Sequence, residues 1–250
     1  DPLPQRDYYG LFACLDNADE PEWVIPDAEQ TRMVEETTAA LAKAWGRGFS
    51  FDNLTLHNFN YMLFQHETAG MSVVNSFTYA AAAACIAIVL GLSVAYIVRR
   101  ALLPGAAILS FLAMAPFVVP GIVLAIAFYA AYAPPPFTLY GTATILILAF
   151  ATRFLPIGYA NSDAAIRSIN PEMEDAVRIL GGSRLVAIRR VMAPLLKRNL
   201  IGAWLLVFIP ATRELSSALF LYGPKTRTMS VMLMDLSEEG NFEHLAALGF

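Results

Sequence analysis

Two adjacent charged residues, Arg213 and Glu214, interrupt an otherwise apolar run over residues 200–221. Near the centre of a membrane helix a charge costs about 2.5–3.5 kcal/mol, while each large apolar residue contributes about −0.3 to −0.6 kcal/mol. The two sums nearly cancel, so neighbouring helices or a water-filled cavity must receive the charges. Because adjacent helical residues point about 100° apart, each charge needs its own partner. They form either a polar clamp between helices or, with Pro120, the lining of a transport pathway or gate.

Residues for enzymatic or metal chemistry do not occur at the spacing that such sites need. The sequence contains no G-x-x-x-x-G-K-[ST] phosphate loop, so ATP that drives this protein must be hydrolysed by another subunit. The histidines His57, His66 and His244 have no Cys or His neighbours at ligand spacing. Cys14 and Cys85 indicate no disulfide framework. We therefore expect no catalytic residue, no metal site and no cofactor.

A polar stretch at residues 170–194 separates two apolar runs and carries clear helix signals. Asn170 can cap a helix, and Pro171 suits the first helical position. Acidic residues follow in the first turn, where the helix dipole favours negative charge. Gly181 and Gly182 end this helix, because glycine adopts the left-handed conformation at little cost.

A second helix is expected to begin after Ser183, which can cap it, and to be limited by Pro194. On the first helix, four apolar residues line one face at i, i+3, i+4 and i+7 spacing: Met173, Ala176, Val177 and Leu180. A helix of about ten residues is marginal alone in water. Its apolar face therefore lies either in the groove of a partner protein or on the membrane surface as a connector.

The composition indicates a membrane protein. The 250 residues are 57% hydrophobic and 15% charged, whereas about a quarter of the residues are charged in ordinary soluble proteins. Long apolar runs predict four membrane spans, at about residues 74–98, 108–132, 142–160 and 200–221. Prolines should kink or interrupt the second span, and Arg153 in the third can extend to the membrane surface. The expected fold class is an all-α, polytopic transmembrane helix bundle.

The distribution of charge predicts the orientation of the bundle. Residues 1–72 are soluble in character and acidic, with a helix expected over about residues 27–45. Basic residues gather at Arg99 and Arg100 and again in residues 163–198, while the turn between the second and third spans is uncharged. The positive-inside rule therefore makes residues 163–198 cytoplasmic and residues 1–72 extracytoplasmic.

The transmembrane domain is expected to cover residues 73–250. An extracytoplasmic start without a leader needs a preceding span, and the apolar residues 245–250 break off mid-run. We therefore expect the chain to be an excerpt that lacks one span at each end.

The polar stretch resembles the conserved cytoplasmic loop of binding-protein-dependent ABC importer permeases. That loop reads Glu-Ala-Ala, three residues, Gly, nine residues, Ile-x-Leu-Pro. Both spacings hold here, with four conservative substitutions, and the matching residues are Asp175, Ala176, Val177, Gly181, Val191, Ala193 and Pro194. The resemblance implies that this loop, with Glu172 and Arg184 included, is the coupling helix that seats in a cleft of the ATPase subunit.

The resemblance extends over about residues 50–250. Residues 213–250, Asn75 with Ser76, and the turn at residues 119–121 are similar to iron(III) importer permeases, which carry two permease halves in one polypeptide. This chain looks like most of the second half. Thiamine, sulfate, phosphonate and polyamine permeases share most of these features and stay open as alternatives.

The family implies a type I importer permease of the MetI-like fold in the bacterial inner membrane, which is a transport subunit and not an enzyme. The partners it implies are a cytoplasmic ABC ATPase dimer, a periplasmic substrate-binding protein, a second permease half fused upstream and the lipid bilayer, with no nucleic acid. Two other classes compete. An ion-coupled secondary transporter or channel would use Arg213 and Glu214 as its relay, and a structural scaffold would tolerate leucine at both positions.

Overall fold

The computed structural model describes residues 57–249, together with Arg32, Glu35 and Glu36. The chain divides into two compact units, Asp1–Thr55 and Leu56–Phe250. The helix expected over residues 27–45 lies outside the described residues except for the three named above, which are helical.

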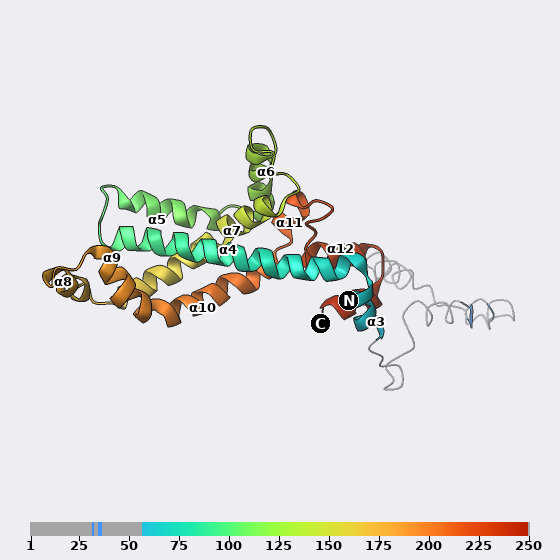
Figure 1. The fold of residues 1–250 in the computed structure, drawn as a ribbon. Coiled ribbons are helices and arrows are strands. Elements are labelled where there is room, and N and C mark those ends of the chain that lie inside the picture. The colour runs from blue at the N-terminus through green and yellow to red at the C-terminus, as the bar shows by residue number, and fades with distance from the viewer. Residues whose placement is uncertain (1–31, 33–34, 37–56, 250) are drawn as a thin grey trace, which may run out of the picture. The chain divides into compact units, whose positions relative to one another are not determined.

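The described part of the second unit is built from helices and contains no strand (Figure 1). This confirms the expected all-α class. The three longest helices are α4 (Glu67–Arg99), α7 (Ala143–Arg167) and α10 (Ala193–Thr212). The shorter elements are α3 (His57–Asn60), η2 (Tyr61–Gln65), α5 (Ala106–Met114), η3 (Ala115–Phe117), α6 (Gly121–Tyr132), α8 (Glu172–Ile179), α9 (Arg184–Ala187), η4 (Ile188–Met192), α11 (Ser216–Leu221), α12 (Met229–Glu238) and α13 (Phe242–Gly249).

Three helical segments are long and apolar enough to cross a membrane, namely Thr68–Arg99, Ala143–Arg167 and Arg184–Thr212. The first two correspond to the spans expected at residues 74–98 and 142–160. The third begins at Arg184, well before the span expected at residues 200–221, and it ends at Thr212, before that expected span would end. Pro210 cannot donate a backbone hydrogen bond, and the N–H groups of Arg213 and Glu214 close the helix with i→i−3 bonds of 3.2 and 3.3 Å.

The second expected span is broken, as its prolines predict. Its two parts, Ala106–Phe117 and Gly121–Tyr132, meet at 111°. The break exposes the carbonyl oxygen of Val119, and Arg153 of α7 donates to it from Nη1 at 2.6 Å. The expectation that Arg153 extends to the membrane surface is wrong, because α7 continues to Arg167 and places Arg153 about 20 Å from that end.

Helix α4 packs along α7 and α10 through small side chains (Figure 1). Ala80, Ala84 and Ala87 of α4 are fully buried. The backbones of α4 and α7 approach each other closely at two glycines, since a Cβ on Gly91 would lie 2.7 Å from the carbonyl carbon of Gly158. Apolar side chains gain nothing by leaving contact with equally apolar lipid tails. Close packing of this kind is therefore what holds two helices together in a membrane.

Replacing Gly91 by alanine is expected to lower the free energy of unfolding by about 1–3 kcal/mol, because the new methyl group overlaps the α7 backbone. Gly202 of α10 is the matched control, since no atom lies within 4 Å of a Cβ built there. Gly202→Ala should be neutral or stabilising by up to about 1 kcal/mol through helix propensity. Thermal unfolding in detergent measures both variants, and equal stability of the two would contradict the close approach.

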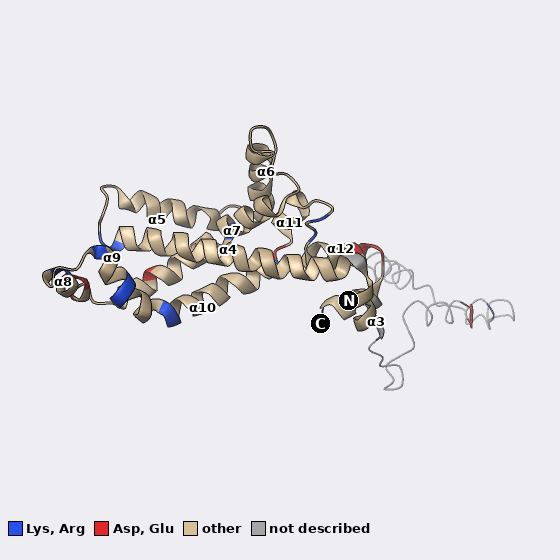
Figure 2. Ribbon diagram, in the orientation of Figure 1, with Lys and Arg blue, Asp and Glu red and all other residues tan. Residues whose placement is uncertain are grey.

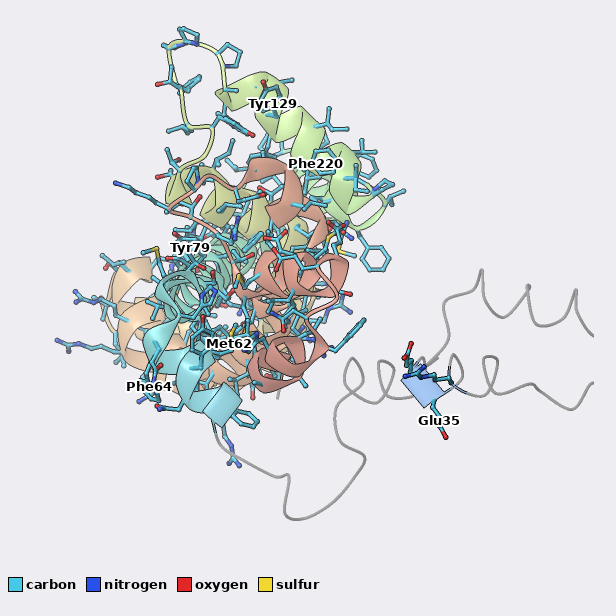
Figure 3. The ribbon with its side chains drawn as sticks, turned by 90° about the vertical axis from the view of Figure 1, so that its right-hand side faces the viewer. Glu35, Met62, Phe64, Tyr79, Tyr129 and Phe220 are labelled. Carbon is cyan, nitrogen blue, oxygen red and sulfur yellow. The ribbon has the colours of Figure 1, made fainter. Side chains whose placement is uncertain are left out.

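The end of the bundle that holds α12 and α13 also holds η2 and the start of α4. Met62 of η2 is fully buried in a cluster with Met232 and Leu236 of α12, whereas Phe64 points outward (Figure 3). Residues 57–72 therefore pack against this end of the bundle, within the compact unit Leu56–Phe250.

Candidate functional site

The polar stretch between α7 and α10 forms a helical hairpin at one end of the bundle (Figure 1). Asn170 opens it as predicted, since its Oδ1 accepts the backbone N–H of Glu172 at 3.0 Å. Helix α8 then ends at Ile179, and Gly181 follows with a φ of +81°, which favours glycine. The N–H groups of Gly181 and Gly182 donate into the last turn of α8 at 3.0 and 2.9 Å, which confirms the predicted glycine stop.

The second helix of the hairpin begins as predicted but does not end at Pro194. Ser183 Oγ accepts the backbone N–H of Val186 at 3.4 Å and caps α9. The helix then runs without a break from Arg184 to Thr212. The π-helical turn η4 shifts the hydrogen-bond register just before Pro194, which falls in the first turn of α10, where a missing N–H is tolerated.

The apolar face of α8 is open to the surroundings. Met173, Ala176 and Leu180 of the predicted stripe are exposed, and Val177 is half-buried against Gly182. Leu180 is 88% exposed and the neighbouring Ile179 is 85% exposed. These side chains have no apolar cover from the described residues, and so they favour a contact outside this chain.

The opposite side of α8 is anchored through a buried carboxylate. Glu174 accepts hydrogen bonds from Arg100 Nε at 2.6 Å and from the Tyr96 hydroxyl at 2.9 Å. The side chains of Arg100 and Glu174 are only 15% and 8% exposed. The sequence assigned Glu174 a role only in the helix dipole and gave no signal for its pairing with residues more than 70 positions away.

A second buried carboxylate joins α4 to α7 at the same end. Asp163 of α7 pairs with Arg99 of α4, whose Nη2 lies 2.7 Å from Oδ2, and with Arg167 one turn further along α7, at 2.8 Å. Figure 2 shows basic residues gathered at this end of the bundle. Arg99 and Arg100, predicted only as markers of orientation, thus hold the end of α4 to both α7 and α8.

The other predicted residues are spread along the hairpin. Asp175 forms an exposed ion pair with Arg178 at 3.8 Å, and Arg184 is also exposed. Val191 is half-buried and Pro194 is exposed, both beyond the turn. The structure therefore brings the residues before the turn onto one short helix and leaves Arg184, Val191 and Pro194 on the neighbouring helix. An open groove of about 510 Å³ at the hairpin tip is lined by Asp175, Arg178, Ile179, Gly181 and Gly182.

The predicted pathway residues lie where two broken helices meet. The sequence places Arg213 and Glu214 within a membrane helix. In the structure they lie instead in the break between α10 and α11. The Glu214 carboxylate accepts the backbone N–H of Ser217 at 3.0 Å and so satisfies the start of α11. A Cβ on Gly121, next to Pro120, would lie 3.5 Å from Glu214 Oε1. Glu214 thus lies beside the break before α6, while Arg213 is exposed.

Sequence comparison finds several permeases, although no protein-family model matches the chain. The ferric transport system permease protein FbpB of Actinobacillus pleuropneumoniae is 32% identical over 82% of this chain and 30% of its own length. The putative ferric transport system permease protein FbpB 1 of Haemophilus influenzae is 32% identical over 75% of this chain and 29% of its own length. The sulfate transport system permease protein CysT of Salmonella typhimurium is 29% identical over 64% of this chain and 62% of its own length.

The fold is that of a solved importer. The crystal structure of a bacterial ABC transporter that imports alginate matches with a TM-score of 0.63 at 16% identity, over 98% of this chain and 90% of that one. This chain belongs to the ABC importer permeases. A second structure of the alginate transporter, in complex with an alginate-bound periplasmic protein, matches with a TM-score of 0.61. The present permease chain spans about 30% of the length of its two ferric relatives.

Among the described residues of this permease, no group of three or more His, Cys, Asp or Glu side chains could hold a metal ion. The hairpin offers a short helix with one face open to the surroundings and the other fixed to the bundle.

Proposed function

We propose that this permease chain forms part of the transmembrane pathway of a binding-protein-dependent iron(III) importer in the bacterial inner membrane. A separate cytoplasmic ATPase dimer engages residues 172–194, and a periplasmic binding protein delivers the substrate on the other side. Residues 163–198 are then cytoplasmic and residues 1–72 extracytoplasmic. The proposed coupling residues are Glu172, Asp175, Ala176, Val177, Gly181, Arg184, Val191 and Pro194.

The observation that carries the proposal is the contrast between the two sides of α8. Ile179 and Leu180 are almost fully exposed, and a short amphipathic helix of this kind suits the groove of a partner protein. On the other side, Glu174 is buried against Tyr96 and Arg100. A membrane-surface connector would need no buried ion pair to hold it to one helix end.

This arrangement supports a route for mechanical coupling. A displacement of α8 acts on the end of α4 through Glu174, and α4 in turn packs along both α7 and α10. Because packed helices move as rigid elements, closure of an ATPase pair can shift these three helices together. The breaks at Pro120 and at Arg213 and Glu214 lie further along the bundle and are proposed to line the pathway or gate.

The iron(III) assignment is supported by the two ferric transport relatives at 32% identity. Because these relatives are about three times as long as the matched region, a second permease half in the same polypeptide, upstream of this chain, is part of the proposal. The sulfate transport relative supports sulfate as a second candidate substrate. Uptake of radioactive iron(III) and of sulfate by cells that depend on the transporter decides between them, and uptake of sulfate alone would overturn the iron assignment but leave the permease function intact.

Co-purification with an ATPase subunit tests the coupling role. The double variant Ile179→Asp/Leu180→Asp is expected to weaken ATPase binding roughly tenfold or more, because two apolar anchors become charged. Insertion and thermal stability should not change, since neither side chain is buried within this chain. Phe242→Asp, an exposed residue of α13 at the other end of the bundle, is the control and should bind the ATPase normally. Normal binding by the double variant would contradict the proposed contact.

A further inference from the structure

A groove of about 750 Å³ runs between α4 and the continuous helix that includes η4 and α10. Two basic side chains, Arg189 and Lys197, line it near the hairpin, and Figure 2 shows basic residues on this part of the helix. Its remaining wall is largely apolar and includes Ile88, Val89, Leu200, Ile201 and Trp204. Both flanking helices are long and apolar enough to cross a membrane, and the groove runs along them.

The indole N–H of Trp204, the polar group of this groove-lining tryptophan, is already used in a hydrogen bond within the chain. The indole N–H of Trp204 donates to Cys85 Sγ at 3.3 Å, and its ring stacks on Phe208 with centroids 4.7 Å apart. Lys197 and Trp204 are seven residues apart, which places them on the same helix face about 10 Å from each other. That separation fits within one leaflet, whose hydrocarbon is about 15 Å thick.

The two cations at the mouth of the groove have no counter-charge within the described part of the chain. The ion pairs there involve Arg99, Arg100, Arg167, Arg178 and Arg227 instead. Cations above a dry apolar groove complement a ligand with a negative head and a hydrocarbon tail. Basic pockets between transmembrane helices bind lipid head groups by this chemistry.

We propose that this groove binds an anionic phospholipid. Arg189 and Lys197 hold the phosphate-bearing head group, and one acyl chain follows the apolar wall as far as Trp204. A zwitterionic lipid lacks the net charge that these two side chains select. The proposal requires that α4 and α10 cross the membrane and does not depend on which substrate is imported.

Trp204 is a built-in probe of the site, because the other tryptophans, Trp23 and Trp45, precede the described bundle. With both of these replaced by phenylalanine, the full chain is reconstituted with brominated phosphatidylglycerol or brominated phosphatidylcholine. Brominated phosphatidylglycerol is expected to quench Trp204 fluorescence at about a tenfold lower mole fraction, because each basic residue favours an anionic lipid. Equal quenching by the two lipids would overturn the proposal, and so would the absence of quenching, which would mean that protein covers the groove.

A matched pair of variants separates a specific site from general attraction. Arg189→Gln/Lys197→Gln should bring phosphatidylglycerol down to the level of phosphatidylcholine. Arg190→Gln/Arg198→Gln removes the same charge from the adjacent positions, which do not line the groove, and should keep the preference. Loss of the preference in both pairs would show that net charge alone attracts the lipid and would refute the site. If the first pair fails to fold, Arg189→Lys/Lys197→Arg tests the same charges and should retain the preference.

Discussion

Gly181→Val is expected to uncouple substrate uptake from ATP hydrolysis while leaving membrane insertion intact. Gly181 has a φ of +81°, a conformation that costs a residue with a side chain about 1–2 kcal/mol and a β-branched residue more. No atom lies within 4 Å of a Cβ built there, so the cost comes from the backbone and not from a clash. The strained turn relaxes by changing the angle between α8, which precedes it, and α9, which follows it. Transport in proteoliposomes should fall about tenfold, with ATPase activity retained, since 1.4 kcal/mol corresponds to a tenfold population change.

Gly240 provides the control for backbone strain. Its φ is +72° and its Cβ position is equally open, but it lies after α12 at the other end of the bundle. Gly240→Val should therefore cost similar stability without uncoupling. Gly181→Asn is a second check, because asparagine tolerates the left-handed conformation and should restore much of the coupling. Coupled transport at the normal rate by Gly181→Val would remove the turn from the mechanism.

The hairpin could be predicted from the sequence because its signals are local. The cap at Asn170, the stop at Gly181 and the cap at Ser183 each depend on hydrogen bonds that span a few residues. The same reasoning failed at Pro194, where one π-helical turn was enough to carry the helix past a proline. Hydropathy likewise located the long apolar helices, but it does not detect where a helix ends inside an apolar run. The end of α10 at Thr212 was therefore missed.

The contacts that hold the site together could not be predicted, because they join residues far apart in the chain. Glu174 and Arg100 are separated by 74 positions, and Asp163 and Arg99 by 64. A composition or periodicity argument treats Glu174 as one more acid in a first turn. Only the packing of α4 beside α7 brings Arg100 to Glu174, and this contact buries the Glu174 carboxylate. Arg153 shows the same limit, since its partner is a carbonyl oxygen freed by a break in another helix.

The functional reading of α8 follows from these two kinds of evidence together. Local signals make a short helix with an apolar face, and tertiary packing decides that this face points away from the bundle. A helix that is both anchored and exposed can transmit a displacement, because the anchor converts motion of α8 into motion of α4. The strength of that anchor can be tested directly.

Glu174→Gln is expected to abolish coupled transport by releasing α8 from α4. The substitution keeps the shape of the side chain but leaves Arg100, which is only 15% exposed, without its counter-charge. Removing one partner of a buried ion pair typically costs about 3–5 kcal/mol, more than a short helix can offset by itself. We expect α8 to detach while the spans stay folded. Protease sensitivity of the hairpin and transport in proteoliposomes measure the two effects.

Two further variants show whether the lost interaction is the anchor itself. Asp235→Asn removes the acid of another ion pair, with Arg227, in α12 at the other end of the bundle and should leave transport unchanged. Adding Arg100→Gln to Glu174→Gln removes the unpaired charge as well, so the double variant should recover part of the lost stability and part of the coupling. Additive losses in the double variant would mean that Glu174 and Arg100 act separately, and their ion pair would then not be the route by which α8 moves α4.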